Sequence, residues 1–141
     1  MKKLGYYFTY YTVYSWMRIH AFLPLRLLYG LSDILYLIVY KLVGYRVKVV
    51  RANLKNSFPE KNEKELRGLE KEFYHHFCDY FVETIKVLHI SDEEAEKRIV
   101  FKNIEQVKEL IKDGNSCLMY LGHYGNWEWV PSITRHFTHG E

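Results

Sequence analysis

The sequence predicts an α/β fold from a long amphipathic helical repeat, a continuous apolar run and a turn that opens another helix. The repeat extends from Leu66 to Leu88, the apolar run is Cys117–Leu121, and the last helix is expected to begin near Asn126. A helix, a buried strand, a turn and a helix in this order are typical of α/β proteins. We expect an N-terminal membrane-anchoring segment over residues 1–45, followed by the first part of an α/β domain over residues 46–141.

The composition indicates a globular chain that meets a membrane surface. Of its 141 residues 48% are apolar and 26% charged, which is ordinary, whereas aromatic residues reach 17% and include 13 Tyr. Tyr and Trp collect where protein meets lipid headgroups. The net charge of +3 is spread along the chain without a dense basic face, so we expect no binding to nucleic acid.

The first sixteen residues place tyrosines at helical spacing. Tyr7, Tyr10 or Tyr11, and Tyr14 form an aromatic stripe behind the basic start of the chain. Core packing and contact with a membrane interface are both compatible with this pattern.

The segment from Phe22 to Tyr45 is apolar and long enough to cross a hydrocarbon core, which takes roughly 20 residues. Asp33 lies near its middle, where a charge costs about 2.5–3.5 kcal/mol. A tilted or shallow helix that keeps Asp33 near water or a partner reconciles the two observations. No small-residue cleavage site follows, so we expect a retained anchor with the chemistry on the cytoplasmic side.

A basic stretch follows this anchor. It consists of Arg46, Lys48, Arg51 and Lys55. The excess of positive charge favours a cytoplasmic flank, although a plain solvated helix face is compatible with the same residues.

The middle of the chain predicts helices with recognisable starts. Phe58 and Pro59 interrupt the preceding pattern, and Asn62 with Glu65 forms a capping box for the long repeat. The apolar positions of that repeat are Leu66, Leu69, Phe73, Phe77, Tyr80 or Phe81, and Leu88.

Three shorter elements are expected next. Ser91 and Glu94 predict the start of a short helix, and the run 99–101 a short strand. Apolar residues between Ile104 and Ile111 predict another helix, ended by Lys112 and Gly114. A sheet with two covered faces needs more strands than this chain offers before Glu141, so the sequence predicts a truncated domain.

The cysteines and histidines do not indicate a metal site. Cys78 and Cys117 stand in unrelated apolar contexts, which predicts buried free thiols in a reducing compartment. Two groups of possible ligands exist, namely His75, His76 and Cys78, and His136 with His139. Neither has zinc spacing, and adjacent histidines on a helix point apart, so we expect no metal.

Gly122–Trp129 holds the residues with the clearest chemistry. His123 follows the predicted strand, and Glu128 comes five residues later. The two side chains can meet if His123 lies in a turn, if Gly125 permits a left-handed backbone and if Asn126 caps the helix. The Glu128 carboxylate would then orient the imidazole as a general base that deprotonates a hydroxyl.

This stretch resembles the H-x-x-x-x-[D/E] motif of the glycerolipid acyltransferase superfamily, here His123 to Glu128. The sequence Gly-Asn-Trp-Glu within this stretch is similar to that of the lipid A lauroyl and myristoyl acyltransferase branch. A second stretch looks like the pre-catalytic segment of that branch; its residues are Arg51, Asn53, Leu54 and Ser57-Phe58-Pro59-Glu60.

The resemblance implies transfer of an acyl chain from a thioester donor, usually acyl carrier protein, to a hydroxyl of a lipid A precursor or related glycolipid. It implies His123 and Glu128 as the catalytic pair, and Gly125, Asn126 and Trp127 as substrate-binding residues. It implies no metal or redox cofactor, and a location at the cytoplasmic face of the bacterial inner membrane.

Two alternatives stay open. One is a lysophospholipid or glycerol-phosphate acyltransferase, and the other is a non-catalytic membrane adaptor, which gives no role to the His–Glu pair. Family members continue with arginine- and glycine-containing motifs that are not found before Glu141, so this chain by itself is expected to lack part of the acceptor site.

Overall fold

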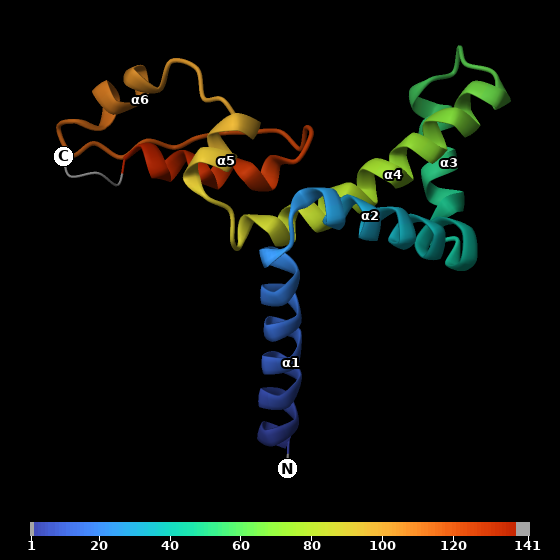
Figure 1. Ribbon diagram of the computed structural model, residues 1–141. Helices are drawn as coiled ribbons and strands as arrows, with labels where there is room; N and C mark the ends of the chain where they lie inside the picture. Colours follow the sequence, from blue (N-terminus) through green and yellow to red (C-terminus); the bar gives the residue numbers. More distant parts are fainter. Residues whose placement is uncertain (1, 138–141) are drawn as a thin grey trace.

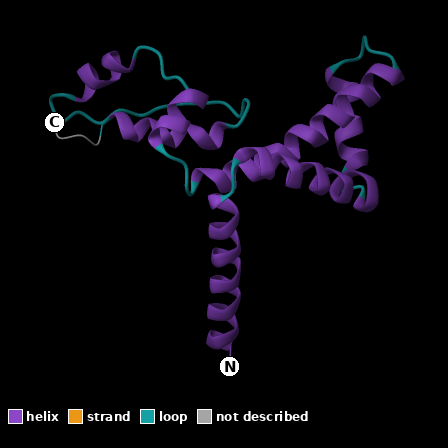
Figure 2. Cartoon of the chain, in the orientation of Figure 1, coloured by secondary structure: helices purple, strands orange, loops and turns teal. Residues whose placement is uncertain are grey.

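The computed structural model describes residues 2–137, which form helices joined by turns and loops (Figures 1 and 2). In chain order they are α1 (Lys2–Phe22), α2 (Leu25–Tyr36), η1 (Leu37–Val43), α3 (Val47–Ser57), α4 (Glu63–Val87), α5 (Asp92–Arg98), α6 (Ile104–Ile111) and η2 (Trp127–His136). The segment η1 is a π-helix, and η2 is a 3₁₀-helix.

The expected α/β fold is wrong, because no strand forms within residues 2–137. The apolar run at 117–121 is an exposed loop in which Leu118 is 76% and Tyr120 89% exposed. The run 99–101 is a connection between α5 and α6. An extended segment becomes a strand only when a neighbour pairs with its N–H and C=O groups, and no described segment does so here.

The core lies where α2 packs along α4. Leu25 and Leu28 contact Val82, and Tyr36 contacts Tyr74 and Cys78. The buried residues of α2 are Leu25, Leu28, Ser32 and Tyr36. They recur every three or four positions, which places them on one face of the helix.

The expected apolar helix of residues 22–45 is broken in the structure. Pro24 separates α1 from α2, and Gly44 ends η1 with a left-handed φ of 64°. Taken singly, none of the described helices combines the length and apolar character needed to cross a bilayer. Among these helices, one bent pair has the length and apolar composition when its two parts are counted together: Leu25–Val43 and Val47–Ser57, which are bent by 96°.

Asp33 keeps access to water, as expected. Its side chain is 74% exposed, and Oδ1 lies 3.9 Å from Nδ1 of His75 on α4. The charge therefore stays outside the apolar core.

Helix α1 projects away from the other elements in Figure 1. Lys86 of α4 anchors its end, because Nζ donates to the carbonyl oxygens of Ala21 and Leu23 at 2.9 and 3.1 Å. The tyrosines of α1 are exposed, and the Tyr10 and Tyr14 rings stack with centroids 6.0 Å apart. The interpretation that this aromatic stripe packs in a core is therefore wrong for the described residues.

The predicted helix starts are confirmed. The Asn62 side chain accepts from the Lys64 and Glu65 amides, and the Glu65 carboxylate accepts from the Asn62 amide, which completes the capping box. Ser91 accepts from the Glu94 amide at the start of α5. Helix α6 ends at Ile111, and Gly114 is left-handed with a φ of 77°.

The two cysteines differ in environment. Cys78 is buried in the core as expected, whereas Cys117 is exposed, so its predicted burial is wrong. The cause is again the missing strand, because Cys117 belongs to the unpaired apolar run.

A buried carboxylate joins α3 and η1 to α4. Glu70 is 1% exposed, and its oxygens accept from Arg51 Nε at 2.7 Å, Arg51 Nη2 at 2.8 Å and the Tyr40 hydroxyl at 2.9 Å. The hydrogen bonds from Arg51, helped by the one from Tyr40, lower the pKa of Glu70 against the opposing effect of burial. The carboxylate is thus held in its charged form.

We predict that Glu70→Gln lowers the free energy of unfolding by about 1.5–3 kcal/mol, because hydrogen bonds to a charged group are lost. The folded-state pKa of Glu70 lies below its unfolded value, so this stabilisation is present above the unfolded pKa and is lost as pH falls through the folded pKa. Urea unfolding between pH 7 and pH 2 should show a smaller acid-induced loss of stability for the variant, because this range extends below the unfolded pKa. Glu72→Gln, at an exposed position of the same helix, is the control. An equal acid-induced loss of stability in wild type and Glu70→Gln would contradict the stabilising role of the charged Glu70 carboxylate.

Candidate functional site

The His123–Glu128 stretch forms a turn that leads into η2. Gly125 is left-handed with a φ of 59°, as expected, and the Tyr124 amide donates to the Gly122 carbonyl oxygen at 3.0 Å. Glu128 lies in the first turn of η2, as expected. Pro131 lies inside η2 and has no amide hydrogen to donate, which disfavours an α-helix there.

The structure does not bring His123 and Glu128 into contact. Among the described residues no hydrogen bond or ion pair joins them, and His123 is exposed in the loop before η2. Its ring meets the Trp127 ring edge to face, with centroids 4.6 Å apart. The expected imidazole–carboxylate contact is thus replaced by an aromatic contact on the same turn.

The Glu128 carboxylate is held by α4 instead. The Tyr80 hydroxyl donates to Oε1 of Glu128 at 2.9 Å. Burial raises the pKa of Tyr80, and the hydrogen bond to Glu128 raises it further, so the phenol keeps the proton that it donates. One carboxylate oxygen is engaged in this way, and Oε2 stays available to another donor.

The Asn126 side chain also binds α4. Its position is the N-cap of η2, as expected, but the side chain makes no cap hydrogen bond. Asn126 Nδ2 donates to Oε2 of Glu83 at 2.7 Å, and Oε1 of Glu83 accepts from the Tyr29 hydroxyl at 2.7 Å. Burial, followed by the hydrogen bond to Glu83, raises the pKa of Tyr29 to about 12.

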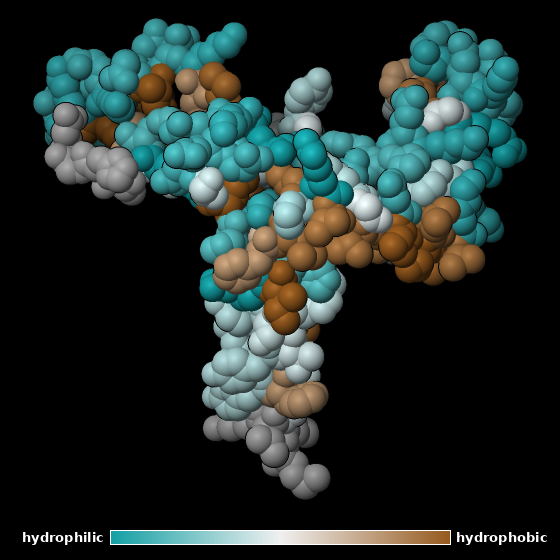
Figure 3. All heavy atoms as spheres, in the orientation of Figure 1, coloured by the Kyte–Doolittle hydropathy of each residue, from teal (hydrophilic) through white to brown (hydrophobic). Residues whose placement is uncertain are grey.

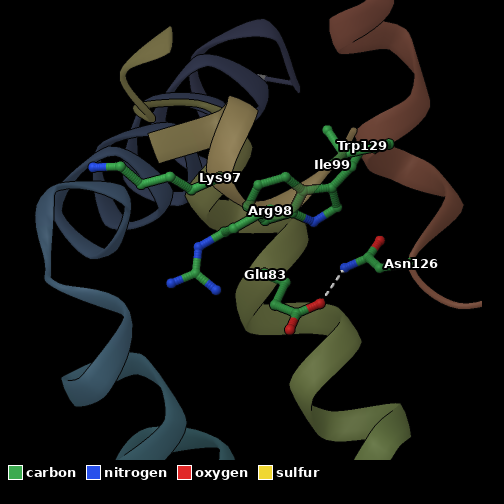
Figure 4. Close-up of a pocket in the computed structure, with 6 residues that line it drawn as sticks. All are labelled: Glu83, Lys97, Arg98, Ile99, Asn126 and Trp129. Carbon is green, nitrogen blue, oxygen red and sulfur yellow. Dashed lines mark hydrogen bonds between the residues drawn. The ribbon is translucent and has the colours of Figure 1, made fainter. Parts of the chain in front are cut away.

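A cleft of about 350 Å³ lies beneath this turn, between α4, the end of α5 and η2 (Figure 4). Its lining residues are Glu83, Lys97, Arg98, Ile99, Asn126 and Trp129. Trp129 is buried at 6% exposure and is the buried residue of η2. Asn126 therefore belongs both to the turn and to the cleft.

The expected substrate-binding residues have three different environments. Gly125 is exposed, Asn126 is half-buried against α4, and Trp127 is half-buried against His123. Within residues 2–137 no three His, Cys, Asp or Glu side chains gather in a way that could hold a metal ion, and His139 lies outside the described residues.

Sequence reasoning missed the contribution of α4 to this site. The sequence pattern places Tyr80 or Phe81 in the apolar repeat and indicates no role for Glu83. Tyr80 and Glu83 are three positions apart and therefore share one helix face, which lies beside the predicted apolar stripe. The partners of this polar face, Asn126 and Glu128, lie more than forty positions away in the sequence.

Comparison with known proteins identifies one family. The model of the family described as bacterial lipid A biosynthesis acyltransferase matches residues 1–136, which is nearly the whole chain. No curated protein and no solved structure matches the chain.

We predict that the turn depends on its hydrogen bonds to α4. Tyr80→Phe and Asn126→Ala should each speed hydrogen exchange of the Trp129 amide about fivefold, because one hydrogen bond contributes about 1 kcal/mol. That amide donates to the Asn126 carbonyl oxygen at 3.2 Å. Tyr124→Phe, which removes a hydroxyl that is part of a 93% exposed side chain, should leave the rate unchanged. If the Trp129 amide exchanges at the wild-type rate in both Tyr80→Phe and Asn126→Ala, the turn does not depend on these hydrogen bonds.

Proposed function

The chain belongs to the bacterial lipid A biosynthesis acyltransferase family and is an acyltransferase, and we propose that it acylates a hydroxyl of a lipid A precursor or related glycolipid at the cytoplasmic face of the inner membrane. The proposed donor is an acyl thioester carried by acyl carrier protein. The observation that supports this function best is the His123–Glu128 turn, which lies within the matched region and carries a base and a carboxylate on one short segment.

The reaction assigns a proton transfer to His123. A ring nitrogen takes the proton of the acceptor hydroxyl, and the hydroxyl oxygen attacks the thioester carbonyl carbon. When the tetrahedral intermediate collapses, the C–S bond breaks and the thiol leaves with the proton from the imidazolium. The products are an ester on the acceptor and a free thiol on the donor.

Glu128 orients and stabilises the imidazolium in this proposal. The Tyr80 hydroxyl holds Oε1, so Oε2 is the oxygen that would accept from the other ring nitrogen of His123. Rotation of the exposed imidazole away from Trp127 brings about this contact in the reacting complex. Catalytic hydrogen bonds commonly form or tighten only when substrate binds.

The proposed membrane location is supported by the outer face of α2 and η1. The face of α2 opposite α4 carries exposed apolar side chains, and η1 continues them; Figure 3 shows this apolar surface along the lower edge of the arm that these helices form. Its main residues are Leu27, Leu31, Ile34, Ile38 and Leu42, with exposures between 37% and 80%. Their spacing of three and four makes a stripe.

Basic residues flank this stripe, and Lys41, Arg46 and Lys48 lie around its C-terminal end. An apolar stripe with a basic border is typical of a helix that lies in the plane of a membrane interface and attracts anionic lipids. We propose that α2 and η1 dock in this way.

We predict that His123→Ala lowers acyl transfer by at least 10²–10⁴-fold, the range expected for loss of a general base. Glu128→Gln should cause a smaller loss, because it removes only the charge that stabilises the imidazolium. The double variant should be hardly worse than His123→Ala, since the two residues act as a unit.

The measurement is ester formation in membranes that contain the whole protein, with acyl carrier protein thioester as donor. A lipid A precursor is compared with lysophosphatidic acid as acceptor. His76→Ala, at an exposed position of α4, controls for loss of a histidine. Near-normal transfer by folded His123→Ala would end the mechanism, and transfer to lysophosphatidic acid alone would end the glycolipid assignment.

We predict that Ile34→Asn and Ile38→Asn each weaken binding to vesicles with anionic lipid by about tenfold or more. A fully buried Ile contributes about 1.5–3 kcal/mol, and 1.4 kcal/mol is a factor of ten. Co-flotation with vesicles measures the effect. Val100→Asn, at a 73% exposed position in the connection between α5 and α6, should bind as wild type does. If all three variants bind equally, α2 and η1 do not form the docking surface.

A further inference from the structure

Two residues that line the cleft each carry a buried polar atom whose hydrogen-bonding capacity is unused. Trp129 Nε1 and Asn126 Oδ1 are both buried, and neither has a hydrogen-bond partner among the described residues. Figure 4 shows the indole nitrogen of Trp129 on the side of the ring that faces Glu83 and Asn126. Buried polar groups in folded proteins are normally paired, so this pair indicates a site for a polar ligand group.

The two atoms require a ligand group that both donates and accepts. Indole Nε1–H is a donor only, and an amide oxygen is an acceptor only. The assignment of this oxygen follows from the amide nitrogen of Asn126, which is committed to Glu83 at 2.7 Å. A hydroxyl satisfies both requirements, because its oxygen accepts from the indole while its hydrogen is donated to the amide oxygen.

Charged ligand groups fit less well. An ammonium group has no lone pair for the Trp129 donor. A phosphate would be placed against the Glu83 carboxylate and the Asn126 oxygen, where like charge and acceptor-to-acceptor contact are unfavourable. The cationic side chains that line the cleft are Lys97 and Arg98, and Arg98 already donates to Glu94 at 2.8–2.9 Å. The interior of the cleft therefore favours a neutral hydroxyl over an anion.

The remaining walls suit a ring that carries several hydroxyls. Ile99 and the indole ring of Trp129 supply apolar surface, and Glu83 offers a charged acceptor beside them. The volume of about 350 Å³ lies within the usual range for small-molecule sites, about 300–1,000 Å³.

We propose that this cleft binds a sugar ring, with one hydroxyl held between Trp129 Nε1 and Asn126 Oδ1. The same chemistry is offered by the sugar headgroup of a membrane lipid and by a free sugar or polyol. The proposal rests on the proposed function only for its biological source, the glycolipid acceptor. Asn126 then connects sugar binding to the His123 turn, of which it is part.

The test uses the whole protein in detergent, with nitrogen-15 in its indole groups. The chain has three Trp residues, and Trp129→Phe identifies the Trp129 signal in the spectrum by its disappearance. Methyl glucoside, which is neutral, glycerol and inorganic phosphate are titrated separately, and a lipid A precursor is compared with the free sugar. We expect methyl glucoside to shift the Trp129 indole N–H signal and the glycolipid to shift it at lower concentration.

Trp129→Phe keeps the apolar ring but lacks the donor, so it should weaken sugar binding, measured by calorimetry, about three- to tenfold. Trp16→Phe, at a 51% exposed position on α1, is the matched control and should bind as wild type does. A shift with phosphate alone, an equal response to glycerol and sugar, or no response to any probe would overturn the proposal.

Binding and transfer fail separately in this design. His123→Ala should bind the sugar as wild type does while losing transfer, because the imidazole does not line the cleft. Sugar binding without any transfer by wild type would reject the proposed function and keep the cleft assignment. Transfer by wild type without sugar binding in the cleft would reject the cleft assignment and keep the proposed function.

Discussion

The packing of α2 against α4 is the contact on which the other parts of the described structure depend. Leu28 and Val82 meet in its apolar centre, and the Ser32 hydroxyl donates to Asp79 at its edge at 2.6 Å. This contact fixes which faces of α4 remain for the other elements. Glu70 then holds α3, Lys86 holds the end of α1, and Tyr80 and Glu83 hold the turn before η2. The candidate site is therefore positioned by a helix that contributes none of the expected catalytic residues.

The two faces of α2 separate two kinds of interaction. One face buries Leu28 and Ser32 against α4, and the opposite face leaves Ile34 and Ile38 exposed. An amphipathic helix usually exposes a polar face, so an apolar one calls for a second apolar environment. A lipid interface at this face would leave the turn attached through α4 rather than through the membrane-facing side chains. Membrane contact and acceptor chemistry would then act on opposite sides of one helix pair.

The sequence predicted local features well and distant pairings poorly. The capping box at Asn62, the cap at Ser91 and the left-handed Gly125 depend on residues within a few positions, and the structure confirms each. A strand at 117–121 needs a neighbour, which composition does not report, and the expectation failed. For the same reason the sequence located the turn but did not predict that Tyr80 and Glu83 hold it.

The attachment of Glu128 to Tyr80 has a consequence for the chemistry of the pair. A carboxylate that must orient an imidazole loses precision if its own side chain is free to rotate, since positioning within about 0.5 Å matters in such sites. A phenol whose pKa is raised by burial holds one oxygen without taking the charge. In the proposed mechanism the second oxygen is the one that accepts from His123. The carboxylate would then be fixed before the histidine arrives, and rotation of the exposed imidazole would be the step left for substrate to complete.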